Sequence, residues 1–139
     1  MGIFIESQFD TQFFLWKELK EWIVCVIEKE GFIVGDLNYS FVSDEEILEI
    51  NRKFLDHDYY TDIITFDEVD YDIINGDIVI SVERVVENAK ELHCEYIEEF
   101  CRVVIHGVLH LCGYADRSEL DVALMRKKEN YYLGTRSFT

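Results

Sequence analysis

Apolar residues recur at helical spacing along several long stretches of the chain. In residues 11–30 they lie three or four positions apart, and Gly31 follows as a suitable stop. Three later stretches begin after a serine that is able to cap a helix, namely Ser43, Ser81 and Ser118. The pattern predicts helices over about residues 11–30, 43–54, 81–92, 95–112 and 118–133.

Shorter segments alternate between apolar and polar positions or are rich in β-branched residues, as strands are. Strands are expected over Gly2–Glu6, Leu37–Val42, Asp62–Phe66 and Asp77–Ser81, the last of them after a turn near Asn75-Gly76. Neither a repeat nor a linker interrupts this order, so residues 1–139 are interpreted as one domain. The order predicts an α/β (α+β) fold, a small mixed sheet of about four strands with one face covered by helices.

The helix expected over residues 95–112 is apolar nearly all round from Val103 onward, so it should be central and buried. It carries His106 and His110, whose spacing of four places both imidazoles on one face. Gly113 is able to end the helix and turn the chain, which brings Asp116 back towards the histidines. Three such ligands leave an open position for water, as in catalytic zinc sites.

Burying two histidines costs free energy unless they are paired or bound to a metal. The alternative is a pair of core histidines bonded to backbone or carboxylate groups. A metalloprotease has the same spacing of ligands but carries a glutamate base after the first histidine, where this chain has Gly107. A peptidase of that mechanism is therefore not expected.

Composition narrows the function further. The formal net charge of -16 argues against loose binding to nucleic acid or to an anionic membrane, although it leaves room for a local basic patch. The apolar runs are too short to span a bilayer and no signal peptide is evident, so a cytoplasmic location is expected. The four cysteines form no C-x-x-C pair and are interpreted as free thiols.

The segment from His106 to Tyr114, His-Gly-Val-Leu-His-Leu-Cys-Gly-Tyr, resembles the corresponding helix end of the YbeY-type bacterial endoribonucleases, or rRNA maturation factors. The segments Thr61–Phe66 and Gly76–Ser81 resemble two strands of the same family. Asn51, Met125 and Glu129 also fit its pattern. The matching motifs extend from about Asn51 to Glu129.

The resemblance implies a four-stranded mixed sheet with a central metal-bearing helix, one zinc ion and cleavage of single-stranded RNA. It further implies roles in maturing the 3′ end of 16S rRNA and in ribosome quality control, with rRNA and the small ribosomal subunit or its proteins as partners, and neither DNA nor a membrane. Two positions depart from the family. Asp116 replaces a third histidine, which lowers the charge on the metal and also admits Mn²⁺. Leu55 replaces an arginine suited to a phosphate.

Other residues must then accept the proton released during cleavage and bind the phosphate of the substrate. Asp62 and Asp77, near the starts of their strands, are candidates for the proton, with turn carboxylates as the alternative interpretation. Arg117 is a candidate for contact with the substrate, with a solvated arginine at the helix start as an equal alternative. Arg52 and Lys53, about one turn before Leu55, are candidates to replace the missing arginine.

Three functions remain open at this point. The first is an endoribonuclease that acts on rRNA. The second is a ribosome-associated binding factor whose metal is mainly structural, and the third is a metal-dependent hydrolase of another substrate. A basic groove at the metal favours the first, a closed metal the second and a deep apolar pocket the third.

Overall fold

The computed structural model describes residues 2–7, 16–57 and 61–138. Its strands are β1 (Gly2–Ser7), β2 (Ile33–Val42), β3 (Ile63–Asp67) and β4 (Ile73–Ser81). Its helices are α1 (Trp16–Lys29), α2 (Asp44–Leu55), α3 (Val82–Leu92), α4 (Tyr96–Leu111) and α5 (Glu119–Leu133). The predicted order of elements is confirmed, and the start of the first helix, predicted at residue 11, lies outside the described residues.

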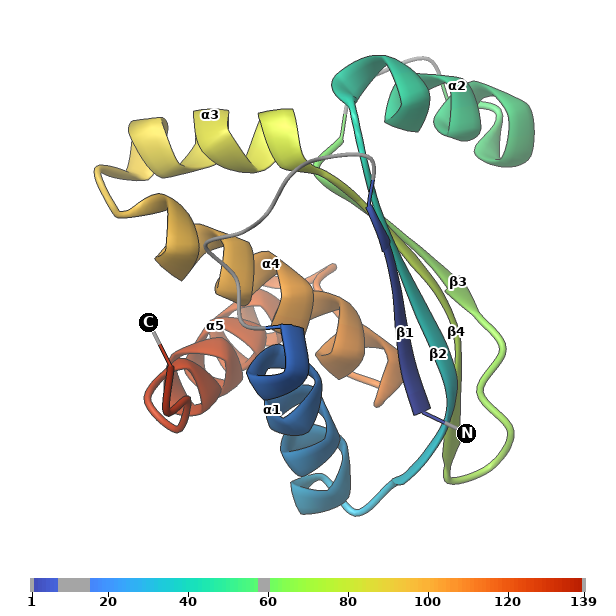
Figure 1. Cartoon of the computed structure of the whole chain (residues 1–139), viewed down its shortest axis with the longest axis vertical. Helices are drawn as coiled ribbons and strands as arrows, with labels where there is room; N and C mark the ends of the chain where they lie inside the picture. The colour runs from blue at the N-terminus through green and yellow to red at the C-terminus, as the bar shows by residue number, and fades with distance from the viewer. Residues whose placement is uncertain (1, 8–15, 58–60, 139) are drawn as a thin grey trace.

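The four strands form one mixed sheet in the order β1-β2-β4-β3 (Figure 1). Strands β1 and β4 both run parallel to β2, while β3 is the antiparallel partner of β4. Parallel neighbours need a crossover, and here the crossovers run through α1 and α2. The predicted fold class is therefore confirmed.

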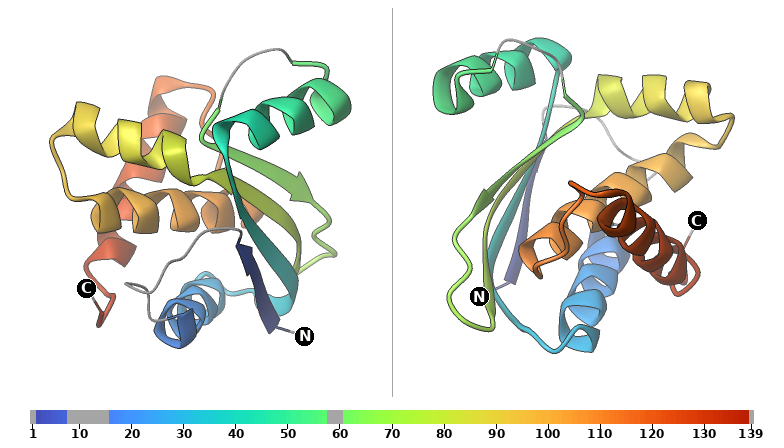
Figure 2. Two further views of the ribbon diagram at one scale, coloured as in Figure 1. Left: turned by 45° about the horizontal axis from the view of Figure 1, so that its top comes forward. Right: turned by 180° about the vertical axis from the view of Figure 1, so that it is seen from behind.

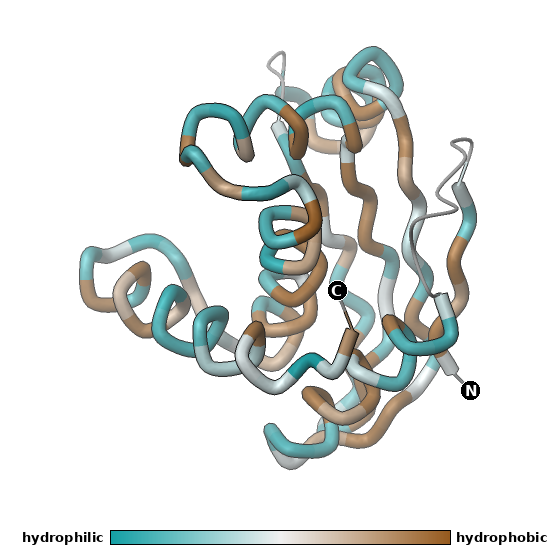
Figure 3. The backbone as a smooth tube through the Cα atoms, turned by 60° about the vertical axis from the view of Figure 1, so that its left-hand side comes forward, coloured by the Kyte–Doolittle hydropathy of each residue, from teal (hydrophilic) through white to brown (hydrophobic). Residues whose placement is uncertain are grey.

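One face of the sheet carries the main core, and α1 and α4 cover it (Figures 1 and 2). Figure 3 shows hydrophobic stretches along the strands and along the helices that face them. The Tyr39 hydroxyl of β2 donates to the Val104 carbonyl of α4 at 3.0 Å, and the Phe41 and Phe100 rings lie 5.0 Å apart. These contacts fix α4 across the centre of the sheet, buried as its sequence predicts.

The opposite face of the sheet is not left bare. Val42, Ile47, Ile64 and Val79 form a second, smaller core in which α2 packs on β3 and β4. The prediction of a single covered face is incomplete on this point. The alternating side chains of β3 and β4 supply both faces with large aliphatic groups, and such groups are buried wherever a helix can reach them.

The turn predicted near Asn75-Gly76 is wrong, because both residues lie inside β4 and the hairpin turns at Tyr71-Asp72 instead. Asn75 sits opposite a break in the register of β2, where its Oδ1 accepts the Asp36 N–H at 2.8 Å. A Cβ on Gly76 would lie 2.5 Å from the Phe66 carbonyl oxygen. Asn and Gly occur both in turns and at irregular pairing within a sheet. Here they belong to an irregular pairing.

The predicted serine caps are confirmed. Ser43 and Ser81 each accept the N–H of the residue three positions on, and Ser118 forms a complete capping box with Asp121. Among the described residues, none of the helices is long and apolar enough to cross a membrane.

Gly76 offers a test of the close approach between β4 and the Phe66 carbonyl of β3. We expect Gly76→Ala to lower the free energy of unfolding by about 2 kcal/mol or more, because φ of +153° and the Phe66 carbonyl both oppose a side chain. Denaturant unfolding measures the change. Gly134→Ala is the control, since that backbone has φ of -71° and the added Cβ meets only ordinary contacts. Equal effects of the two substitutions would contradict the conclusion that the pairing at Gly76 excludes a side chain.

Candidate functional site

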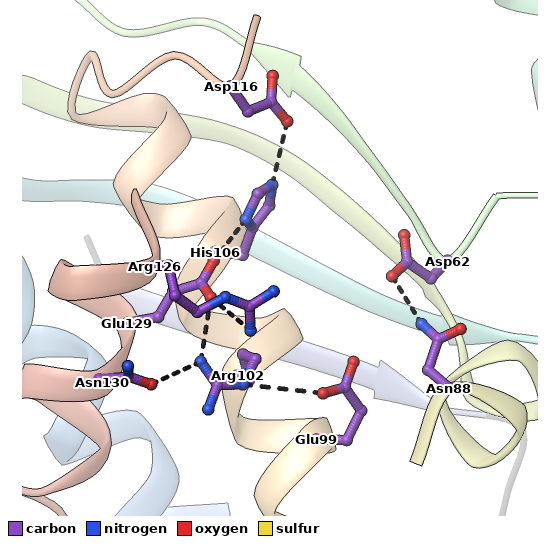
Figure 4. A network of polar contacts seen from close by, with 9 residues as sticks. All are labelled: Asp62, Asn88, Glu99, Arg102, His106, Asp116, Arg126, Glu129 and Asn130. Atoms are coloured by element: carbon purple, nitrogen blue, oxygen red, sulfur yellow. Dashed lines mark hydrogen bonds and ion pairs between the residues drawn. The ribbon is translucent and has the colours of Figure 1, made fainter. Parts of the chain in front are cut away.

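A polar pocket of about 370 Å³ runs along one side of α4. Glu99, Arg102 and His106 lie three to four residues apart on that helix and so share this side (Figure 4). Helix α5 forms one wall with Arg126 and Glu129. The start of β3 and the loop before α5 complete the pocket with Thr61, Asp62, Ile63 and Asp116.

His106 is held from both ends of its ring. Its Nδ1 lies 2.7 Å from the Glu129 Oε2, and its Nε2 lies 3.6 Å from the Asp116 Oδ2. A carboxylate at Nδ1 favours a proton on that nitrogen, which leaves Nε2 as the nitrogen that faces Asp116 and that a cation would bind. Zinc-binding histidines are typically oriented in this way by a carboxylate.

Glu129 is the shared acceptor of the pocket. Its side chain is 5% exposed, and its Oε1 lies 3.2 Å from the Arg102 Nη1 and 3.5 Å from the Arg126 Nη1. Arg102 also donates to the Asn130 side chain at 2.9 Å and lies 3.8 Å from Glu99. A row of alternating charges thus runs through the wall between α4 and α5.

Burial and these charges shift two pKa values. Burial lowers the pKa of His106, but the hydrogen bond and charge of Glu129, with Asp116 behind them, outweigh burial and raise it above the ordinary value. Burial raises the pKa of Glu99, and nearby Arg102 only partly offsets this. The pocket therefore favours a cation at its His106 end.

The structure brings two of the three predicted metal ligands together. His106 faces Asp116, whereas His110 lies one turn further along α4 and is exposed. Across residues 2–7, 16–57 and 61–138, no three His, Cys, Asp or Glu side chains are close enough to hold a metal ion. The chemistry of the donors and the Glu129 contact fit zinc, and the three-ligand site stays a prediction.

The two predicted proton carriers are separated by the sheet. Asp62 lines the pocket, where its Oδ2 accepts a hydrogen bond from Asn88 of α3 at 3.0 Å. Asp77 is exposed on the face that Val79 shares with α2, since Ile78 and Ile80 take the face that packs on α4. Asp62 thus lines the same pocket as His106, and Asp77 does not.

The three predicted substrate cations also separate. Arg52 and Lys53 lie on α2, which contributes none of the described residues that line the pocket. Leu55, at the end of the same helix, is 39% exposed. Arg117 is exposed beside Asp116, also outside the described lining.

Sequence reasoning missed the roles of Glu99, Arg102 and Glu129. Glu99 and Glu129 are each 4% exposed. Charged residues are almost never so buried unless they are paired. The signal was present, because Glu99, Arg102 and His106 lie on one side of a mostly apolar helix, but their partners on α5 come from a later part of the chain.

A second buried carboxylate supports the loop that carries Asp116. Glu30, just after α1, accepts the Tyr114 hydroxyl at 2.6 Å, the Tyr132 hydroxyl and the Lys128 ammonium at 3.1 Å. Burial alone raises the pKa of Glu30, yet these three donors outweigh it and lower the pKa below its ordinary value. The cluster ties α1, the loop and α5 together.

Comparisons with known proteins match one family over nearly the whole chain. A family model described as Endoribonuclease YbeY matches residues 5–136. Endoribonuclease YbeY of Porphyromonas gingivalis is 51% identical over 109 residues, 78% of this chain and 72% of that protein. Endoribonuclease YbeY of Cytophaga hutchinsonii is 46% identical over 132 residues, 93% of this chain and 92% of that one. A solution structure from Thermotoga maritima matches with a TM-score of 0.69 and 33% identity, over 94% of this chain and 86% of that one.

The Glu30 cluster predicts a pH-dependent stability. We expect Glu30→Gln to lower the free energy of unfolding at pH 7 by about 2 kcal/mol, because a buried charged acceptor is lost. A lowered pKa in the folded state stabilises the protein above the unfolded value and loses this effect as pH falls through the folded value. The difference between the two proteins should therefore shrink below about pH 4. Denaturant titrations across pH measure it, with exposed Glu28→Gln as the control; a difference independent of pH would contradict the assignment.

Proposed function

The chain belongs to the endoribonuclease YbeY family, and on that basis we propose that it is a zinc-dependent endoribonuclease that cleaves single-stranded RNA. The proposed zinc ligands are His106, His110 and Asp116. When bound, zinc supplies the Lewis acidity that activates a phosphodiester and the attacking water. Mn²⁺ is the alternative ion, because a carboxylate ligand also suits it.

One observation carries the proposal, namely the orientation of His106 between Glu129 and Asp116 in an open polar pocket. Glu129 keeps the Nδ1 proton in place, so Nε2 is the ring atom that is able to bind a metal ion. His110 lies one turn further along the same helix, where a change of its side-chain rotamer would direct it to the same ion.

The charge of the pocket supports the need for a metal. Its described lining contains four carboxylates, those of Asp62, Glu99, Asp116 and Glu129, against the guanidinium groups of Arg102 and Arg126. A phosphodiester is an anion and would be repelled by such a surface. A divalent cation held by His106 and Asp116 would offset this excess of negative charge, so substrate binding is expected to depend on the metal.

Asp62 is the proposed proton acceptor. It lines the same pocket as His106, and the hydrogen bond from Asn88 fixes one of its oxygens and leaves the other to act. Gly107 occupies the position where metalloproteases carry their glutamate base, so the proton must leave through another group. Asp62 is the candidate that the fold brings to the pocket.

The biological role proposed from the family resemblance is maturation of the 16S rRNA 3′ end and ribosome quality control in the cytoplasm. The small ribosomal subunit or its proteins would then present the RNA. This reconciles an RNA substrate with the net charge of -16, because a bound ribosome supplies contacts that a strongly acidic protein cannot make with free RNA.

The other two functions make different demands on the pocket. A hydrolase of an apolar substrate needs an apolar cavity, and the polar lining around His106 disfavours it. A binding factor with a mainly structural metal needs a closed ion with four protein ligands. The pocket is not the basic groove that the first function predicts, since its described lining holds more carboxylates than guanidinium groups. Its polar and open character still favours the nuclease over the other two, provided that a metal is bound.

Metal analysis tests the proposal first. We expect about one zinc ion per chain in the purified protein and strongly reduced zinc in Asp116→Ala, because the variant loses one of three ligands. Elemental analysis measures both, with Glu119→Ala as the control for loss of a nearby exposed carboxylate. Zinc-loaded protein should cleave a labelled single-stranded RNA, and His106→Ala should not. A chain that takes up no metal even from added zinc would overturn the proposal.

A further inference from the structure

The last helix contains the basic run Arg126-Lys127-Lys128, and the fold sends its three side chains to three different places. Successive residues of a helix point about 100° apart. Arg126 therefore enters the pocket, Lys127 is exposed outside the described lining, and Lys128 bonds to Glu30 of the structural cluster. A run that looks uniform in the sequence thus occupies three distinct environments in the structure.

We propose that Arg126 is the phosphate-binding residue of the pocket and that its ligand is a phosphodiester of single-stranded RNA next to the proposed metal. The inference rests on the proposed function, which it deepens. Arg126 lines the pocket together with His106 and Asp116, at the end where a metal is proposed (Figure 4). A phosphate there would meet the guanidinium and the metal together.

The two arginines of the pocket are not equivalent. The Arg102 side chain is 16% exposed and is engaged by Glu99, Glu129 and Asn130, so it holds α4 to α5. The Arg126 side chain is 53% exposed, and its Nη1 lies 3.5 Å from Glu129. A guanidinium carries five N–H donors in a planar fork. The Glu129 contact orients one edge of this fork and leaves the group open to the pocket.

Arginine is well suited to the task at this position. Its planar fork matches two phosphate oxygens at once, and its charge persists at any physiological pH. The surrounding carboxylates repel an anion, so a fixed cation beside the metal is needed to draw the phosphate in. Arg117 has the same chemistry, but it lies outside the described lining of the pocket.

The experiment compares Arg126→Ala with Lys127→Ala, which removes the same charge from the next residue of the same helix. Binding of a labelled single-stranded RNA is measured by fluorescence anisotropy at several salt concentrations, on full-length zinc-loaded protein with a cleavage-resistant 2′-O-methyl oligonucleotide. We expect Arg126→Ala to weaken binding about tenfold and to reduce the slope of log K against log salt by about 0.7. Lys127→Ala should stay within about twofold, and Arg126→Lys should recover part of the loss because it keeps the charge without the fork.

Zinc content is the readout that separates this role from a structural one. It should be unchanged in Arg126→Ala, and loss of zinc would assign Arg126 to the support of Glu129 instead and overturn the proposal. Equal losses from Arg126→Ala and Lys127→Ala, or a loss produced by Arg117→Ala in place of Arg126→Ala, would overturn it as well.

The outcome remains separable from that of the proposed function. If the native protein binds RNA without cleaving it, the nuclease proposal fails while the binding comparison still judges Arg126. If it binds no RNA, titration with inorganic phosphate followed by NMR replaces the oligonucleotide, and Arg126→Ala should abolish the response. A native protein that responds to neither ligand would overturn the assignment.

Discussion

The carboxylate of Glu129 is buried between α4 and α5 and is shared by donors from both helices. A buried carboxylate left without partners is strongly destabilising, so the two helices must meet where His106, Arg102 and Arg126 surround it. The same contact that satisfies this charge also orients the imidazole. Stability of the α4–α5 crossing and orientation of His106 therefore both depend on the same carboxylate.

The distribution of charge resolves an apparent conflict between an acidic chain and an anionic substrate. The described surface of the pocket holds more carboxylates than guanidinium groups, so attraction to RNA cannot come from the protein surface as a whole. In the proposed function it arises from a cation beside His106 and from Arg126 next to it. A site of this kind would bind a single phosphate at a defined place instead of a length of backbone.

The sequence was most informative where structure is local. The caps at Ser43, Ser81 and Ser118 and the burial of α4 follow from residues a few positions apart. Asn75-Gly76 was misread because its signal is common to turns and irregular strand pairs, and only the distant Phe66 decides between them. Of the site, His106 and Asp116 were predictable from one motif. The partnership of Glu129 with His106 depends on how two helices cross, which no local pattern contains.

The two helical walls of the pocket and the strands of the sheet differ in the length of chain that separates the contacting elements. Helices α4 and α5 are consecutive and are joined by residues 112–118, so their meeting closes a short loop. Pairing of β1 with β2 must instead close the segment 8–32, and β2 reaches β4 only across α2 and β3. Short closures cost less entropy and form faster. The α4–α5 wall of the pocket is thus low in contact order, and it has the topology of a region that is able to assemble before the sheet is complete.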